Sequence, residues 1–433
     1  MIYRIETACR SCAGTDLAPV LALGNTPLAD RLVTADMLAT SDPTVHLDLV
    51  CCASCGLVQI TATVQPDILF GQTFQNFSSV SYALLAHSME NALELIDRCE
   101  LSDESLVIEI ASNDGYLLRN FVERSIPVLG IDPAKDPAAA AERIGVPTIK
   151  DYFGRDLASK LKRDGKTADL VVANNVLAHV ADLNGLVEGI ATVLKPDGLA
   201  VLEMPYVADL IDHGEFDTIY HQHLCYFSMT ALVALFKRHG LVVQDVRRLW
   251  IHGGSLRIFV GHGAEPSADV EALLEHERAR RLDGPQGYHA IAAQVRSLKS
   301  ELVALLQDYR SSGQKIVAYG AAAKATTLLA YCGIGRETLD YVVDRNPHKH
   351  GRSMPGCRLP IEPVERLLED QPNAVLLLSW NFADEIIAQQ QEYLARGGTF
   401  IVPIPELRLV EGDIHRNTAA IKTDQPLVIV DHS

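Results

Sequence analysis

Short apolar runs alternate with helix-length segments through the middle of the chain. Four such runs are expected strands, at residues 105–110, 127–131, 169–173 and 198–202. Strands that alternate with helices form a parallel sheet with helices on both faces, so the pattern predicts a doubly wound α/β domain. Two later runs, at 241–246 and 256–260, lie too close together for a helical crossover and predict an antiparallel pair at the sheet edge.

The last third of the chain repeats the α/β pattern. A long helix is expected over residues 288–309. Further strands are expected at 315–319, 339–343, 374–378 and 399–404. Residues 264–287 are charged and lack a clear apolar period, which predicts a linker between two α/β units.

Length and charge narrow the class of protein. At about 100 to 200 residues per domain, 433 residues predict two to four domains. We divide the chain into three domains, at 1–68, 69–265 and 266–433.

The net charge is −17, from 38 Lys and Arg against 55 Asp and Glu, which argues against nucleic acid as a partner. No apolar run approaches the roughly 20 residues of a membrane span and the N-terminus lacks an apolar signal core, so we expect a cytoplasmic protein without a membrane partner.

Nine cysteines, an odd number without an export signal, disfavour a disulfide framework. Four of them form two Cys-x-x-Cys pairs, Cys9 with Cys12 and Cys52 with Cys55, and such turns present two thiolates to one tetrahedral zinc ion. The 39 residues between the pairs exceed the usual zinc-ribbon spacer, so unrelated buried thiols are the alternative. Four sulfur ligands would close the site, which predicts a structural zinc and leaves Cys51 as a spare.

Polar residues follow the first three strands of the central sheet, where ligands of doubly wound sheets bind. The expected cofactor-binding residues are Glu109, Ala111, Ser112, Asn113, Gly115, Asp132 and Asn174. Asp132 follows Glu109 by 23 residues and could bind a ribose diol. The loop lacks the Gly-x-Gly that lets backbone approach a pyrophosphate, which favours S-adenosylmethionine over a nicotinamide dinucleotide.

The strongest candidate for catalysis is the segment 216–228. Two imidazoles and two phenols lie within seven residues there, and a histidine that titrates near neutral pH can accept a proton from a substrate. A polar surface loop is the alternative interpretation. Lys324, at a turn of small residues before a helix, is interpreted either as an anion ligand or as a solvated lysine. The aromatic segment 70–98 is either a linking helix or a lid over the cofactor site.

Together these motifs resemble the S-adenosylmethionine-dependent sugar C-methyltransferases of deoxysugar biosynthesis. The matching segments are the two cysteine pairs, 109–118, 174–179, 220–228, 252–257 and 315–324. The resemblance covers essentially the whole chain in the same order. It implies an N-terminal zinc-binding domain, a central Rossmann-like methyltransferase domain and a C-terminal Rossmann-like domain. The last would help to hold a nucleotide-linked 4-keto sugar, typically one carrying thymidine diphosphate.

The resemblance also implies a mechanism. A base removes the proton from a carbon next to the ketone, and the resulting enolate attacks the methyl group of S-adenosylmethionine. The implied catalytic residues are His223 as the base, Tyr220, His179 and Gln222. The implied substrate-binding residues are Lys324, Phe74, Tyr82, His252 and Ser255.

Three positions depart from the family pattern. Gln222 stands where the family commonly has Glu, which should leave His223 a weaker base. Phe74 lies in a stretch where the family has tyrosine hydroxyls. Ala111 replaces a glycine of the cofactor loop, which should be tolerated if its φ is negative. These changes leave methyl-donor binding expected and the sugar or stereochemical outcome open.

Two other functions fit the same residues. Removal and return of the proton without methyl transfer would make a keto-sugar epimerase. Loss of catalysis, suggested by Gln222 and Phe74, would leave a protein that binds a nucleotide sugar or cofactor. In all three the partner is a small molecule, and a monomer is compatible with each.

Overall fold

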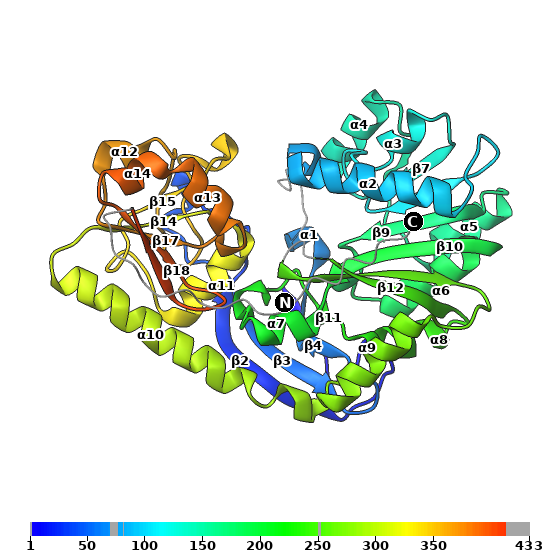
Figure 1. Cartoon of the computed structure of the whole chain (residues 1–433), viewed down its shortest axis with the longest axis horizontal. Coiled ribbons are helices and arrows are strands. Elements are labelled where there is room, and N and C mark those ends of the chain that lie inside the picture. Colours follow the sequence, from blue (N-terminus) through cyan, green and yellow to red (C-terminus); the bar gives the residue numbers. More distant parts are fainter. Residues whose placement is uncertain (1, 70–76, 81, 250–252, 413–433) are drawn as a thin grey trace, which may run out of the picture.

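Two α/β lobes lie on either side of a small sheet formed mainly by the N-terminal part of the chain (Figure 1). The structure is a computed structural model and describes residues 2–69, 77–80, 82–249 and 253–412. The central part of the chain builds one lobe and the last third builds the other. This arrangement confirms the predicted α/β class with a small N-terminal β region.

The N-terminal region contains a four-stranded sheet and a separate pair of strands. The sheet has the order β11-β4-β3-β2. Its strands are β2 (Leu17–Pro27), β3 (Thr44–Cys52), β4 (Val58–Ile60) and β11 (Cys225–Tyr226). The separate antiparallel pair is β1 (Tyr3–Ile5) with β5 (Ala62–Val64), followed by α1 (Pro66–Leu69). Because β11 belongs to the chain of the central lobe, the segment just before it is tied to the N-terminal sheet.

The central lobe is built on a seven-stranded sheet of order β12-β13-β10-β9-β6-β7-β8. Its strands are β6 (Val107–Ile110), β7 (Val128–Ile131), β8 (Thr148–Ile149), β9 (Ala168–Asn174), β10 (Leu194–Pro205), β12 (Val242–Leu249) and β13 (Ser255–Gly261). The first five are parallel to one another. β13 is antiparallel to both β10 and β12, which confirms the predicted edge pair.

Helices cover both faces of this sheet, and the strands therefore bury almost every side chain. The helices are α2 (Tyr82–Arg98), α3 (Arg119–Val122), α4 (Lys135–Arg143), α5 (Arg155–Arg163), α6 (Leu183–Val193), α7 (Val207–Asp212) and α8 (Met229–Lys237). Strand order reverses between β6 and β9. The carboxyl ends of these two strands therefore mark the usual ligand position of a doubly wound sheet.

The C-terminal lobe has a six-stranded sheet of order β16-β15-β14-β17-β18-β19, parallel except for β19. Its strands are β14 (Ile316–Tyr319), β15 (Val342–Val343), β16 (Ile361–Glu362), β17 (Ala374–Leu377), β18 (Thr399–Val402) and β19 (Arg408–Glu411). Its helices are α10 (Ile291–Ser311), α11 (Ala323–Cys332), α12 (Arg366–Asp370), α13 (Ala383–Gln389) and α14 (Gln391–Ala395).

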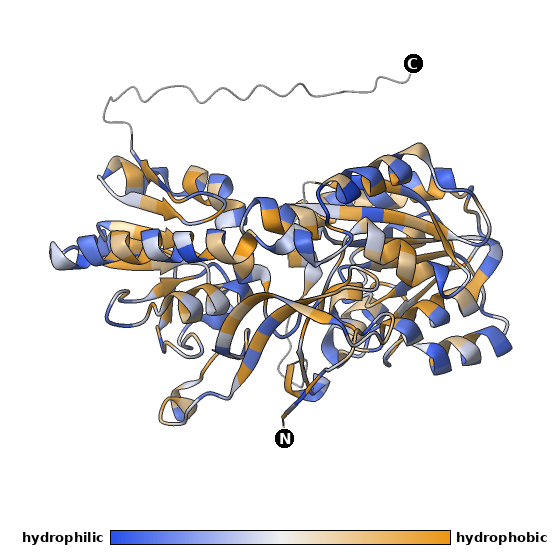
Figure 2. Cartoon of the chain, turned by 90° about the horizontal axis from the view of Figure 1, so that it is seen from below, coloured by the Kyte–Doolittle hydropathy of each residue, from blue (hydrophilic) through white to orange (hydrophobic). Residues whose placement is uncertain are grey.

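Helix α10 runs along the lower side of the C-terminal lobe toward the N-terminal sheet (Figure 1). Hydrophobic and polar residues alternate along it (Figure 2). Its buried side chains recur every three or four residues, at Val295, Leu298, Leu302 and Leu306, which is the spacing of a helix with one apolar face.

The predicted linker over residues 264–287 is wrong, because this segment contains helix α9 (Ala268–Ala279). The Ser267 hydroxyl caps the helix by accepting from the Val270 N–H. Near its other end Glu277 is fully buried, and its carboxylate accepts the backbone N–H groups of Met229 at 2.6 Å and Thr230 at 2.8 Å. Only two side chains of α9 are fully buried, so its sequence carries little apolar periodicity.

Among the described residues, no helix is both long and apolar enough to cross a membrane. The apolar residues instead lie mainly in the strands and on the inner helix faces of the two lobes (Figure 2).

Candidate active site

The four cysteines of the predicted zinc site lie together. Their Sγ atoms are all within 4.8 Å of one another, with Cys9 and Cys55 3.5 Å apart and Cys12 and Cys52 3.6 Å apart. A tetrahedral zinc ion with bonds of about 2.3 Å requires sulfur atoms about 3.8 Å apart, so this cluster fits zinc. Cys51 is also buried, but its Sγ faces the carbonyl of its neighbour at 3.8 Å. The spare cysteine is therefore the one that the sequence predicts.

The first cysteine turn is docked on the central lobe. The Asn184 amide in α6 donates to the carbonyls of Arg10 at 3.1 Å and Ser11 at 3.0 Å. The Arg238 guanidinium, at the end of α8, bonds the Ser11 hydroxyl. A metal at this cluster would therefore stabilise the contact between the N-terminal region and the central lobe.

The predicted cofactor-binding residues gather at the carboxyl ends of β6, β7 and β9. Asp132, just after β7, accepts the N–H groups of Asn113 and Ala134, each at 2.8 Å, and so fixes the loop that follows β6. Ala111 in this loop has φ +56°. The condition of a negative φ is therefore not met, and the alanine occupies a left-handed conformation that glycine adopts more easily.

Several buried polar atoms at this end of the sheet have no hydrogen-bond partner among the described residues. They are Glu109 Oε2, Ser112 Oγ, Asp114 Oδ1, Asn174 Oδ1 and both amide atoms of Asn91 in α2. Leaving one such group unpaired costs about 1–3 kcal/mol. Burial, with the charges of Asp132 and Asp114, raises the pKa of Glu109 well above its usual value. A ligand with hydroxyl and ammonium donors would satisfy the oxygens, and an acceptor such as a carboxylate would satisfy the Asn91 amide nitrogen. S-adenosylmethionine has all three groups.

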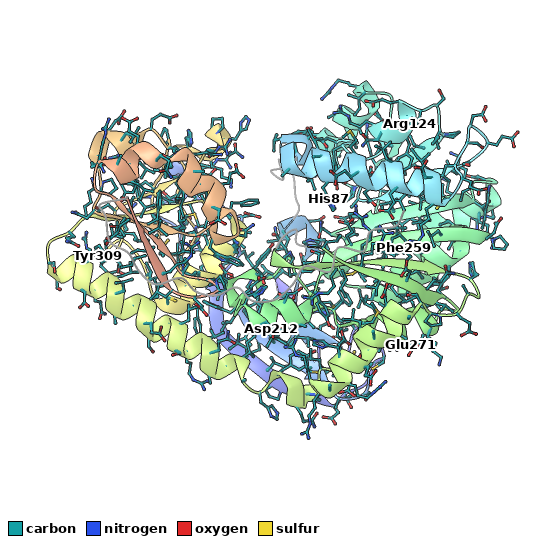
Figure 3. All side chains as sticks on the ribbon, viewed as in Figure 1. His87, Arg124, Asp212, Phe259, Glu271 and Tyr309 are labelled. Carbon is teal, nitrogen blue, oxygen red and sulfur yellow. The ribbon has the colours of Figure 1, made fainter. Side chains whose placement is uncertain are left out.

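A buried charge cluster lies beside this end of the sheet and was not predicted. Glu203 in β10 is opposite Arg257 in β13 and pairs with its guanidinium at 2.7 Å. His87, on the side of α2 that faces the sheet (Figure 3), places Nε2 2.9 Å from the same carboxylate. Burial alone would raise the pKa of Glu203, but the His87 hydrogen bond and the Arg257 charge outweigh it and lower that pKa.

The central element of the candidate catalytic site is His223. Its Nδ1 lies 2.9 Å from the Thr218 carbonyl and its Nε2 lies 2.9 Å from the Tyr220 hydroxyl. A carbonyl can only accept, so Nδ1 carries the proton and Nε2 presents its lone pair. That is the tautomer a base requires. Burial raises the pKa of Tyr220, which keeps the phenol protonated as a donor.

His179 reaches the same place from the end of β9. Its ring centroid lies 4.8 Å from that of His223, and its Nδ1 donates to the Gln222 carbonyl at 2.7 Å. Burial lowers the pKa of His179, so this imidazole stays neutral near pH 7. The Gln222 side chain is buried, and its Nε2 has no partner within the described part of the chain. His221 points away instead and lies 3.2 Å from the Val45 carbonyl of β3.

The predicted substrate-binding residues are only partly brought together. Lys324, at the start of α11, lies 3.7 Å above the ring of Trp380 and bonds the Asn381 side chain. Burial lowers the pKa of Lys324 to about 8, although the negative charges of Asp217 and Glu215 act to raise it. These two acidic residues lie on the chain just before Tyr220. Lys324 thus borders the catalytic segment from the C-terminal lobe.

Ser255 is buried at the start of β13, opposite Pro205. The two glycines before it have φ +91° and +126°, and they pack so closely on Glu215 and Asp209 that a side chain would not fit. Phe74 and His252 lie outside the described residues. Tyr82 is the first residue of α2.

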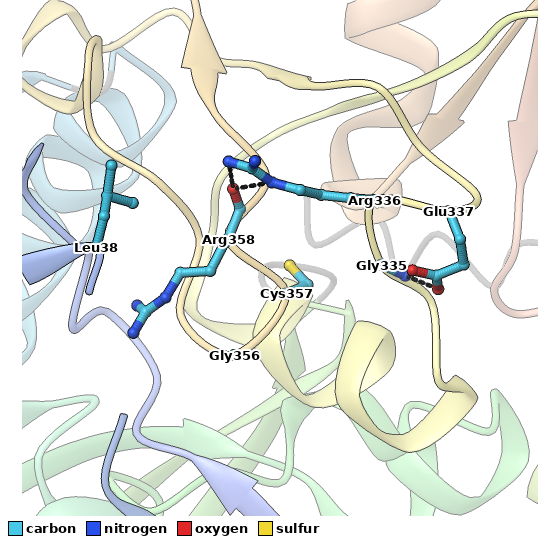
Figure 4. Close-up of a pocket in the computed structure, with 7 residues that line it drawn as sticks. All are labelled: Leu38, Gly335, Arg336, Glu337, Gly356, Cys357 and Arg358. Atoms are coloured by element: carbon cyan, nitrogen blue, oxygen red, sulfur yellow. Dashed lines mark hydrogen bonds between the residues drawn. The ribbon is translucent and has the colours of Figure 1, made fainter. Parts of the chain in front are cut away.

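A separate surface pocket of about 470 Å³ lies where the N-terminal region meets the C-terminal lobe (Figure 4). Leu38 lines it from one side, and Arg336, Cys357 and Arg358 line it from the other. The Arg358 guanidinium is already paired with Asp42 at 2.9 Å. None of the predicted site residues lines this pocket.

Comparison with known proteins identifies the family. Three family models match in succession: a zinc binding domain over residues 9–70, a methyltransferase domain over 85–246 and a C-methyltransferase C-terminal domain over 250–405. The C-methyltransferase NovU of Streptomyces niveus is 34% identical over 415 residues, which cover 95% of this chain and 99% of that protein. The chain belongs to the C-methyltransferase family. The predicted resemblance and the predicted enzyme class are thereby confirmed.

More distant matches cover only part of this C-methyltransferase. A ubiquinone biosynthesis O-methyltransferase of Methylobacterium sp. is 27% identical over 165 residues, 34% of this chain and 63% of that protein. A solved methyltransferase from Clostridium acetobutylicum is 10% identical with a TM-score of 0.33, covering 42% of this chain and 92% of that chain. The glycopeptide N-methyltransferase MtfA is 14% identical with a TM-score of 0.32, covering 41% of this chain and 94% of that chain.

Three contributions to the site escaped the sequence. His87 and Trp380 were not singled out in the sequence, and Arg257 was named only as part of the segment 252–257, without its partner; all three lie far apart in the chain from the groups that they contact. Glu203 could have been predicted as a site residue, because it is the last acidic residue of an apolar strand and parallel strands end at the ligand side of the sheet.

Proposed function

We propose that this C-methyltransferase transfers the methyl group of S-adenosylmethionine to a carbon next to the ketone of a nucleotide-linked 4-keto deoxysugar. The observation that carries the proposal is the arrangement of His223, with Nδ1–H on the Thr218 carbonyl and Nε2 toward the Tyr220 hydroxyl. A neutral imidazole in this tautomer can take a proton from an acidic carbon.

The neighbouring groups suit the developing charge. Removal of the proton leaves negative charge on the ketone oxygen, which donors aimed at it would stabilise. Tyr220 can supply an O–H donor because burial keeps its pKa high. His179 lies 4.8 Å from His223 between ring centroids and provides a second polar ring at the same place. Together these three side chains can hold, deprotonate and stabilise a ketone.

The residues at the ends of β6, β7 and β9 would hold S-adenosylmethionine, which supplies an electrophilic methyl group. Asp132 would face the ribose, and the unpaired oxygens of Glu109 and Asn174 would accept donors of the cofactor. Asn174 is paired with Glu203 across β9 and β10, so cofactor and buried charge cluster would be neighbours. By holding the rest of the cofactor rigidly, these residues would present its methyl group to the substrate carbon that His223 deprotonates, and S-adenosylhomocysteine would be the leaving group.

The C-terminal lobe supports the nucleotide part of the substrate. After β15, Asp344 accepts the N–H groups of Ala321 and Asn346, each at 2.8 Å. Asp132 in the central lobe makes the same two kinds of hydrogen bond. It accepts one N–H from the loop after the neighbouring strand and one from the residue two positions further along its own chain segment. A doubly wound sheet with such a loop favours a nucleotide at its carboxyl edge. Lys324 would add positive charge on the side of the catalytic segment.

The test is a direct assay. Purified protein is supplied with S-adenosylmethionine and a panel of 4-keto sugar nucleotides, and mass spectrometry measures a product heavier by one CH₂ unit. The variant His223→Gln should lose turnover and retain cofactor affinity, and Gln222→Glu is the informative neighbour, because a carboxylate should raise the basicity of His223. Absence of cofactor binding and product across the panel would refute the proposal.

The configuration of the sugar carbon and its methylation separate the two reactions in heavy water. Either enzyme can exchange the acidic proton for deuterium, but without a methyl donor only an epimerase would also invert the sugar carbon. A methyltransferase should give methylated product only with the donor. The unpaired polar atoms at the cofactor end of the sheet favour transfer, because epimerisation by His223 alone would need no ligand there.

A further inference from the structure

The segment between helix α7 and His223 is held by two side chains of the C-terminal lobe. The Trp380 indole N–H donates to Asp217 Oδ2 at 2.7 Å, and the Thr327 hydroxyl donates to the Ile219 carbonyl at 2.8 Å. Asp217 and Ile219 are fully buried, and Thr327 is 1% exposed. These bonds connect residues 163 and 108 positions apart in the chain, so they exist only in the assembled protein.

The residue between the two anchored positions is Thr218. Its carbonyl accepts the Nδ1–H of His223 at 2.9 Å, and this bond decides which ring nitrogen carries the proton. If the carbonyl moved away, the imidazole would lose the acceptor that selects its tautomer. The proton could then shift to Nε2, where it would remove the lone pair that a base needs.

We infer that Trp380 and Thr327 are positioning residues that set the tautomer and location of His223 by holding the segment 217–219 from the C-terminal lobe. The inference rests on the proposed function, in which His223 is the base. It adds that the lobe opposite the methyltransferase domain assembles this base.

Lys324 is close to both positioning side chains. Lys324 and Thr327 lie one turn apart on α11, and the Lys324 ammonium lies 3.7 Å from the centre of the Trp380 ring. A ligand that contacts Lys324 would therefore act on the side chains that hold the segment 217–219. Substrate seated in the C-terminal lobe and the geometry of the base are coupled through these contacts.

The test uses two variants that each remove a single hydrogen-bond donor from the full-length protein. Trp380→Phe keeps an aromatic ring beneath Lys324 but removes the indole N–H. Thr327→Val keeps the side-chain shape but removes the hydroxyl, and Thr327→Ser restores the donor. Tyr393→Phe is the matched control, because its buried hydroxyl donates to the Pro372 carbonyl within the same lobe.

Two measurements distinguish a change in the position of His223 from a general loss of folded structure. Nitrogen-15 spectra of labelled histidine, with His223→Gln used for assignment, report the tautomer of His223 in protein without substrate. Deuterium incorporation into a 4-keto sugar nucleotide reports the rate of proton removal. Affinity for S-adenosylmethionine is measured by calorimetry as a check on the central lobe.

Trp380→Phe and Thr327→Val should shift the His223 signals toward the Nε2–H tautomer and slow exchange about tenfold to a hundredfold, since a displacement of about 1 Å has that effect on a positioned group. Thr327→Ser and Tyr393→Phe should resemble the unmodified protein, and cofactor affinity should stay unchanged. Unaltered His223 spectra in both donor-removing variants would overturn the inference. If the unmodified protein exchanged no keto sugar, the proposed function would fail, while the substrate-free spectra would still decide the positioning.

Discussion

Asp217 provides the sharpest test of the electrostatics in this structure. Its carboxylate is fully buried, one oxygen accepts from the Trp380 indole and the other has no partner among the described residues. Burial raises its pKa from 3.8 to about 6, although the Lys324 charge acts in the opposite direction. Glu215, whose pKa burial raises to about 7, contributes a further charge near Lys324.

The raised pKa of Asp217 sets the sign of the effect. The folded protein holds this proton more tightly than the unfolded chain does, so the free energy of unfolding falls as pH rises from about 4 to about 6. A shift of about two units corresponds to about 3 kcal/mol. Asp217→Asn removes the titration while keeping an oxygen for the indole donor. The free energy of unfolding of the variant, relative to that of the unmodified protein, should therefore rise by about 3 kcal/mol as the pH rises from about 4 to about 7.

Urea unfolding of both proteins across this pH range measures the difference. Groups remote from Asp217 titrate equally in the two proteins and cancel, whereas Glu215, whose pKa the Asp217 charge raises, contributes to the measured difference near pH 7. Asp384→Asn is the control, because that carboxylate is 98% exposed and should leave the difference near zero at every pH. A stability difference for Asp217→Asn that does not change with pH would refute the reasoning, since it would mean that Asp217 stays charged when buried.

Three further outcomes follow from the geometry. Ala111→Gly should be more favourable than the helical control Ala140→Gly by about 1–2 kcal/mol in urea unfolding, because only Ala111 has a positive φ; equal losses would contradict this. Cys12→Ser should abolish stoichiometric zinc by elemental analysis and lower the melting temperature, whereas Cys51→Ser should retain the metal. Arg257→Ala should destabilise the protein by about 3–5 kcal/mol, because it leaves a buried carboxylate without its guanidinium partner; a loss below 1 kcal/mol by urea unfolding would show that this charge is solvated.

Patterns that depend on near neighbours were visible in the sequence. The x-x spacing of the cysteine pairs predicted the cluster that the structure shows, and a turn of that length brings its two thiols together by itself. The apolar runs at 105–110 and 127–131 predicted the central sheet, because burial on both faces requires nearly continuous apolar strands. Helix α9 was missed for the opposite reason: a buried Glu277 looks like a surface residue when its backbone donors are unknown.

The sequence also did not predict the local conformation of single residues. Nothing in the residue type of Ala111 announces φ +56°, since the loop is bent by the Asp132 carboxylate that holds the Asn113 N–H. In the same way, two neighbouring imidazoles looked alike in sequence. In the structure the His221 ring contacts a backbone carbonyl of β3, whereas the His223 ring contacts the Tyr220 hydroxyl.

By itself the sequence determined the composition of each part: four thiolates for a metal, an α/β sheet with polar residues at its strand ends, and a histidine and tyrosine three positions apart. These follow from periodicity and spacing, which act over a few residues. Only the tertiary structure decided which distant groups complete them. Arg257 neutralises Glu203 because β13 lies beside β10, and Trp380 holds Asp217 because two lobes meet there. Such contacts satisfy buried polar groups across the fold, and the chemistry of each group does not reveal where its partner lies in the chain.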